Sequence, residues 1–197
     1  MGRCTVPSGA ARERWSAELT PSADRPFAEL LAGLSERTPA PGAGSAVAWS
    51  AALAAGLLEM VASFAGSSAE AAAARATVLR AELLAAGERE LHAYEPVLSA
   101  KSEDERRAAL SAASETPLAI ARAAAEVAEL AAEVADASKP SLKGDAVAGV
   151  LLAEATTRAA ARLVEINLAG VPGDARLGEV AELSGRAARA RERALGD

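Results

Sequence analysis

Two loops carry the residue types that most readily bind an anion, and each leads into a predicted helix. Residues 41–45, Pro-Gly-Ala-Gly-Ser, offer accessible backbone N–H groups and a hydroxyl at the positive end of a helix dipole. Residues 138–144 contain Lys139 and Lys143, two of the chain's three lysines, beside Asp145. Both loops therefore indicate a site for a carboxylate or a phosphate. Each also has a simpler interpretation, a capped turn for the first loop and solvated surface charges for the second.

Other kinds of site are harder to build from this sequence. Cys4 is the only cysteine and His92 the only histidine, so neither an intrachain disulfide nor a Cys/His zinc site is possible. No phosphate-binding Walker loop, dinucleotide glycine fingerprint or paired-histidine metal motif is present. We therefore expect no metal and no bound cofactor.

The elements that position these loops are predicted to be helices. About a quarter of the residues are alanine, which favours helix, while only 3% are aromatic and β-branched residues are sparse. The formal net charge of -6 disfavours a nucleic-acid partner, because phosphate binding needs a basic surface. We expect an all-α bundle of five or more helices.

Residues 45–65 form the most apolar stretch and require a choice between two environments. The stretch is long enough to cross a bilayer and contains a single charge, Glu59. Its apolar content is mostly alanine, which inserts poorly, and no basic residue closely flanks it. A helix that is apolar all round also suits the centre of a large bundle. We therefore expect a buried central helix and no membrane partner.

Proline, glycine and capping residues divide the chain into helices without a domain boundary. We expect residues 1–23 to be a flexible extension without an export signal, and residues 24–197 to form one cytoplasmic helical domain. Dense alanine lets helices approach closely and bury little area per residue, so we also expect a homodimer. Helices are predicted from about residue 27, over 45–65, from 69 to about 94, from 103 with a kink or new start at Pro117 to 137, from 145 to about 168, and over 175–195.

Four short segments, in order, resemble the cyclodeaminase half of formiminotransferase-cyclodeaminase and the related methenyltetrahydrofolate cyclohydrolases. Together they extend over most of the chain beyond the N-terminal extension. They are Thr-Pro-Ala-Pro-Gly-Ala-Gly-Ser at 38–45, Leu-Leu-Glu-Met-Val at 57–61, Thr-Pro-Leu at 116–118, and Gly-Asp-Ala at 144–146 followed by Glu-Ile-Asn-Leu at 165–168.

The resemblance implies a helical dimer that converts 5-formimino-tetrahydrofolate to 5,10-methenyl-tetrahydrofolate and ammonia, or opens the methenyl ring with water. It implies a carboxylate that moves protons, Asp145 as first candidate and Glu90 as second. His92 is two residues from Glu90 and on another helix face, which favours a structural role. The folate-binding residues implied are Gly42, Gly44 and Ser45 for orientation, Lys139 and Lys143 for the glutamate tail, and Asn167 for the pterin or, equally, for a helix terminus.

This chain also departs from the family pattern at polar positions. Ala43 replaces the middle glycine of the turn, Ser-Phe-Ala at 63–65 replaces Asn-Leu-Thr, and residues 138–143 replace a Gly-Asn-rich loop. These changes favour an alternative function, a folate-binding or structural helical dimer without catalysis. The retained glycine turn, Asp145 and Asn167 favour the enzyme.

Overall fold

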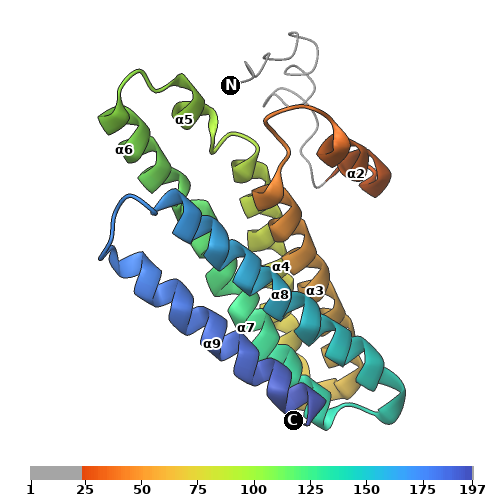
Figure 1. Ribbon diagram of the computed structural model, residues 1–197. Coiled ribbons are helices and arrows are strands. Elements are labelled where there is room, and N and C mark those ends of the chain that lie inside the picture. Colours follow the sequence, from red (N-terminus) through yellow and green to blue (C-terminus); the bar gives the residue numbers. More distant parts are fainter. Residues whose placement is uncertain (1–23, 197) are drawn as a thin grey trace.

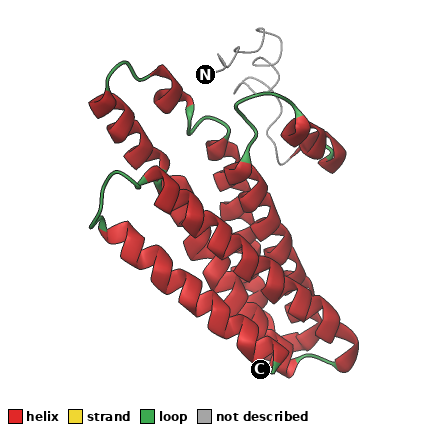
Figure 2. Cartoon of the chain, viewed as in Figure 1, coloured by secondary structure: helices red, strands yellow, loops and turns green. Residues whose placement is uncertain are grey.

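The computed structural model describes residues 24–196, and within them the chain is helical without a strand (Figure 2). The predicted extension, residues 1–23, lies outside this described part. The elements are α2 (Phe27–Ser35), α3 (Ala43–Ala65), η2 (Gly66–Ala69), α4 (Glu70–Glu90), α5 (Glu95–Ser99), α6 (Glu103–Ala113), α7 (Glu115–Ala137), η3 (Pro140–Leu142), α8 (Lys143–Asn167) and α9 (Ala175–Leu195).

Five long helices, α3, α4, α7, α8 and α9, make the bundle (Figure 1). Helix α3 packs against α4, α7 and α8, while α9 packs against α7 and α8. The core between them is built mainly from alanine with a few larger residues such as Leu58, Leu118 and Val150. The all-α prediction is confirmed, and small side chains in the core allow close helix approach.

Helix α3 is the predicted apolar helix, and it begins at Ala43, two residues earlier than expected. Its central position in the bundle is not confirmed, because only one face packs against other helices. On the opposite face Leu53 is 53% exposed and Phe64 is 63% exposed. The helical segment Ala43–Ser99, which includes α3, contains a stretch long and apolar enough to cross a membrane, and half of that stretch is buried inside the protein. Packing against three neighbouring helices accounts for that buried half.

Helices α7 and α9 run parallel and are joined by a ladder of ion pairs. In each pair the two residues are 57 positions apart, and successive pairs advance by seven residues on both helices. A seven-residue step returns a side chain to the same helix face, which fixes the register of the two helices. The pairs are Arg122 with Glu179, Arg186 with Glu129, and Arg193 with Asp136.

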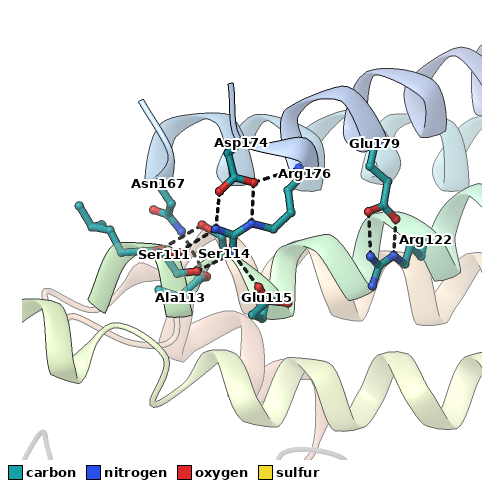
Figure 3. A network of polar contacts seen from close by, with 10 residues as sticks. Ser111, Ala113, Ser114, Glu115, Arg122, Asn167, Asp174, Arg176 and Glu179 are labelled. Atoms are coloured by element: carbon teal, nitrogen blue, oxygen red, sulfur yellow. Dashed lines mark hydrogen bonds and ion pairs between the residues drawn. The ribbon is translucent and has the colours of Figure 1, made fainter. Parts of the chain in front are cut away.

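Arg176 ties the start of α9 to the junction between α6 and α7 (Figure 3). Its guanidinium donates to both carboxylate oxygens of Asp174, to the carbonyl and hydroxyl oxygens of Ser111, and to Glu115. These bonds use the complete donor set of an arginine side chain. The hydrogen bonds from Arg176 lower the pKa of Asp174 to about 2. The network therefore holds one end of the bundle together.

Candidate functional site

A cavity of about 170 Å³ opens at the end of the bundle where α3 begins and α4 and α8 end. Four segments that are distant in sequence meet there, so only the folded bundle creates this site. The lining residues are Pro39, Gly42, Ala43, Gly44, Ser45, Glu90, Ala93, Tyr94, Ala113, Pro117, Leu163 and Asn167.

Glu90, the last residue of α4, is the only charged residue among those that line the cavity. Its Oε1 atom is buried and has no hydrogen-bond partner within residues 24–196. Burial raises the pKa of Glu90 to about 7, against a smaller opposing effect of the neighbouring Arg89 charge. Near neutral pH the carboxyl group can therefore both accept and release a proton.

Gly44 provides the space that the Glu90 carboxyl group occupies. A Cβ atom at position 44 would overlap Oε2, Cδ and Cγ of Glu90. The glycine turn therefore has a function beyond the exposed N–H groups expected from its sequence, because it lets the carboxyl group lie against the first turn of α3. The first N–H groups of α3 have no carbonyl partner inside the helix, and the residues that carry them line the cavity.

A second glycine, Gly87, supports the site from behind. A Cβ atom there would lie 2.6 Å from Nε1 of Trp49, which is only 5% exposed. The hydroxyl of Ser45 donates to the carbonyl oxygen of Gly87 at 3.3 Å and so joins α3 to α4 one turn before Glu90. Ser45 is only 1% exposed, and this bond occupies its hydroxyl. Ser45 therefore holds the cavity wall in place.

Asn167 reaches the cavity from the last turn of α8. Its side-chain Nδ2 donates to the carbonyl oxygen of Ala113, the last residue of α6, at 3.2 Å. This is the helix-terminus bond named as one of two possibilities from the sequence. Asn167 also lines the cavity, which leaves its carbonyl oxygen as a candidate acceptor for a ligand.

The second predicted loop lies at the opposite end of the bundle (Figure 1). Asp145 is in the first turn of α8, whereas Asn167 is its last residue, so about 33 Å of helix separates them. Helix α8 begins at Lys143 without a side-chain cap, and Asp145 is its third residue, where we had expected the helix to start. Lys143 Nζ donates to the carbonyl oxygen of Ala135 near the end of α7, and Lys139 is exposed. Within one chain these residues do not meet Glu90.

Other titratable residues do not extend the site. His92 lies at the surface, and its Nδ1 is 3.1 Å from Oε1 of Glu95. Within the described part of the chain, no group of three His, Cys, Asp or Glu side chains is placed to hold a metal ion.

The sequence did not single out the apolar and aromatic wall of the cavity as ligand-contacting. Tyr94, 43% exposed, comes from the turn after α4, and Leu163 comes from α8. Pro117 was predicted to mark a kink or a new helix start; it lies in the first turn of α7, as the second alternative has it, and lines the cavity. Tyr94 follows Glu90 by four residues, a spacing that would place both on one face of the longer helix predicted from the sequence, whereas α4 ends at Glu90.

Comparison with known proteins supports one assignment. No curated protein sequence matches the chain. The crystal structure of formiminotetrahydrofolate cyclodeaminase from Thermotoga maritima matches with a TM-score of 0.82 and 24% sequence identity, covering 87% of this chain and 94% of that chain. This likeness establishes the shared fold. The sequence profile of formiminotransferase-cyclodeaminase matches residues 26–183, which include every helix from α2 to α8 and the complete cavity lining. The chain belongs to the formiminotransferase-cyclodeaminase family.

Proposed function

We propose that this protein is a folate cyclodeaminase that forms 5,10-methenyl-tetrahydrofolate and ammonia from 5-formimino-tetrahydrofolate, with Glu90 as its acid–base residue. The observation that carries the proposal is the carboxyl group of Glu90, whose pKa is raised to about 7 in the cavity of a family member. Asp145, the other candidate, is at the far end of α8.

The proposed reaction is a matter of moving protons around one carbon atom. N10 attacks the formimino carbon and must lose its proton, while the formimino nitrogen must gain two protons before it leaves as ammonia. One of these comes from N10 and the other from solvent. A carboxyl group with a pKa near the working pH can accept the first proton and deliver both in turn. No cofactor is needed for these steps.

The charge of the cavity fits this product. The methenyl ring carries a positive charge that is absent from the neutral formimino group. Glu90 is the only charged residue on the cavity wall. Its ionised carboxylate and the methenyl cation that forms would stabilise each other. The hydrogen-bonding groups around it, the first-turn N–H groups of α3 and the Asn167 carbonyl oxygen, are available to orient the ligand.

The main argument for a non-catalytic dimer weakens in the structure. Ser63 and Ala65 replace polar family residues, but both lie near the end of α3, whereas Gly44 and Ser45 line the cavity at its start. The helix rise places Ser63 about 28 Å from that end. The loop at 138–143 is likewise remote. Within one chain these replacements therefore lie away from Glu90, and only Ala43, which replaces the middle glycine of the turn, lines the cavity.

Turnover of 5-formimino-tetrahydrofolate tests the proposal directly. Methenyl-tetrahydrofolate absorbance and released ammonia should rise together in equal amounts. Rapid loss of added methenyl-tetrahydrofolate, without ammonia formation from the formimino compound, would instead identify a cyclohydrolase. Calorimetric binding of folates with neither reaction would identify a non-catalytic binding protein.

Replacing Gly44 by alanine should lower the rate about 10- to 100-fold while the protein stays folded, because the new methyl group displaces the Glu90 carboxyl group. The measurement is kcat for methenyl formation together with a thermal melt. Gly178→Ala is the matched control, since Gly178 is on α9 and its Cβ would meet nothing within 4 Å. Equal rates for the two variants would contradict the positioning role of Gly44.

A further inference from the structure

Asn167 carries the only carboxamide side chain of this protein, since the sequence has no other asparagine and no glutamine. It is the last residue of α8 and lines the cavity. A carboxamide accepts hydrogen bonds at one end and donates them at the other, and the two ends have nearly the same shape. The surrounding structure must therefore determine which end of Asn167 a ligand meets.

The carbonyl oxygen of Ala113 determines this orientation. Along a helix this oxygen would accept from the N–H group four residues later, but that residue is Pro117, which has no N–H group. Asn167 Nδ2 donates to the oxygen instead, at 3.2 Å. Only the nitrogen end of a carboxamide can bond to a carbonyl oxygen, so the oxygen end of Asn167 is left for an N–H group of the ligand.

Arg176 holds the segment that carries this carbonyl oxygen, and it does so from outside the cavity lining. Helix α6 passes into α7 through the single residue Ser114, and Arg176 bonds to both sides of that junction (Figure 3). Its Nη1 donates to the carbonyl oxygen of Ser111 at 2.9 Å and to Oε1 of Glu115 at 2.6 Å, and its Nη2 donates to the Ser111 hydroxyl at 2.7 Å. Ala113 lies between the two residues that Arg176 contacts.

Asp174 fixes the direction of the Arg176 guanidinium. Its Oδ1 accepts from Nε at 2.9 Å and its Oδ2 from Nη2 at 2.7 Å, and both side chains are largely buried. A two-point bond of this kind constrains orientation as well as distance. The loop between α8 and α9 is therefore attached to the last turn of α6 near both of its ends, by Asn167 and by Arg176.

We propose that Arg176, held by Asp174, is a positioning residue for the cavity. Through the junction between α6 and α7 it keeps the Ala113 carbonyl oxygen in place, and Asn167 consequently presents its oxygen to the ligand and not its NH2 group. The cavity then selects a ligand with an N–H donor at this point, such as the ring N–H and amino groups of a tetrahydropterin. The class of ligand rests on the proposed function, whereas the effect of Arg176 on Asn167 does not.

The first test needs no ligand. Because Asn167 is the only carboxamide, it gives the only carboxamide NH2 signals in the nitrogen–proton NMR spectrum of the labelled protein. These protons should exchange slowly with water in the wild type, since Nδ2 is hydrogen-bonded. Arg176→Met should speed the exchange several-fold, because the bond would open more often. Unchanged exchange in Arg176→Met would overturn the proposal, whatever the protein binds.

Arg122→Met is the matched control. Arg122 on α7 donates to both carboxylate oxygens of Glu179 on α9, so it joins the same two bundle helices, seven residues beyond Glu115 (Figure 3). Its loss should leave the Asn167 signals unaltered. Equal changes in the two variants would assign the effect to a general loosening of the bundle and overturn the proposal.

Circular dichroism and thermal melts establish that each variant is folded, and Arg176→Lys takes the place of Arg176→Met if the methionine variant is not. Lysine keeps the charge but offers three donors from one nitrogen in place of five from a planar fork. The exchange of the Asn167 protons should therefore change in the same direction, and wild-type exchange in a folded Arg176→Lys protein would contradict the role of the fork.

The second test is calorimetric binding of 5-formyl-tetrahydrofolate, which has an oxygen in place of the formimino nitrogen and so cannot release ammonia. Arg176→Met should weaken binding about 3- to 10-fold, the equivalent of one hydrogen bond, and Arg122→Met should leave it unchanged. In turnover of the formimino compound, Arg176→Met should raise KM while kcat and its pH midpoint stay near those of the wild type. A fall in kcat with an unchanged KM would contradict a role in orienting the ligand.

A double variant shows whether Arg176 acts through Asn167. Arg176→Met combined with Asn167→Ala should bind 5-formyl-tetrahydrofolate no more weakly than Asn167→Ala alone, and losses that multiply would overturn the proposed route. Wild-type binding without turnover, with weaker binding in Arg176→Met, would refute the cyclodeaminase and retain the positioning role. A wild type that does not bind the compound would overturn the ligand selection proposed for Asn167.

Discussion

Replacing Glu90 by glutamine should reduce the rate of methenyl-tetrahydrofolate formation by roughly 10²–10⁴-fold, because an amide of nearly the same shape cannot exchange a proton. The shape of the cavity should survive, since the amide is uncharged and Glu90 Oε1 has no hydrogen-bond partner in residues 24–196 that the change would break. The measurement is kcat from methenyl absorbance at neutral pH, with folate binding by calorimetry. Binding within a few-fold of wild type would show that the site remains formed.

Asp145→Asn is the control that separates the two carboxylates. Asp145 lies in the first turn of α8 at the far end of the bundle, so its replacement should leave kcat unchanged. It should cost at most about 1 kcal/mol of stability through the lost charge near the helix N-terminus. If instead Asp145→Asn stops turnover while Glu90→Gln retains it, the acid–base role belongs to Asp145 and the cavity is not the reaction site.

Much of the fold is predictable from the sequence because the helix ends are encoded locally. The prediction of a final helix over 175–195 is confirmed at both ends. Asp174 accepts from the N–H group of Arg176 at its start, and Gly196 adopts a left-handed conformation after its end. Ser102 likewise bonds to the N–H group of Glu105 and begins α6 as predicted. Caps of this kind act over two or three residues, so a single sequence reveals them.

The helix ends that were misplaced have no such local signal. Helix α4 was expected to continue to about residue 94, but it ends at Glu90 and four residues of turn follow before α5. Helix α8 begins two residues before Asp145 without a side-chain cap. The early end of α4 matters for the site, because it places Glu90 opposite the first turn of α3. Contacts between α3 and α4 determine that placement, and these are long-range.

The candidate site was predictable in part as a set of residues, since Lys139, Lys143 and Asp145 lie at or just before the start of α8 and away from the cavity, and it was not predictable as an arrangement. Gly42, Gly44, Ser45, Glu90 and Asn167 all line one cavity, as a common ligand site would require. The clash that a Cβ at position 44 would make with Glu90 involves residues 46 positions apart, and no spacing rule indicates it. The preference for Asp145 over Glu90 followed from the resemblance to the family. Burial, which raises the pKa of Glu90, is known only from the fold.

The raised pKa of Glu90 predicts an unusual dependence of stability on pH. In the unfolded chain the carboxyl group titrates at its ordinary value of 4.5, whereas in the folded chain its pKa is about 7. Between these values the folded state binds more protons than the unfolded state. Its contribution to the free energy of unfolding is therefore fully present below pH 4.5 and is lost as the pH rises through 7. The loss should be on the order of 3 kcal/mol, at about 1.4 kcal/mol for each pH unit of difference.

Comparison with Glu90→Gln isolates this effect, because the other titrating groups are the same in both proteins. The free energy of unfolding of the wild type, measured by urea denaturation, should fall relative to that of Glu90→Gln as the pH is raised from 4.5 to 8. The paired carboxylates behave in the opposite sense: hydrogen bonds from Arg176 lower the pKa of Asp174 to about 2, so its contribution is lost only in acid. Parallel curves for the two proteins would mean that water reaches the Glu90 carboxyl group in the folded state. In that case Glu90 would be fully ionised at neutral pH. It could then accept a proton but would hold none to donate to the departing ammonia.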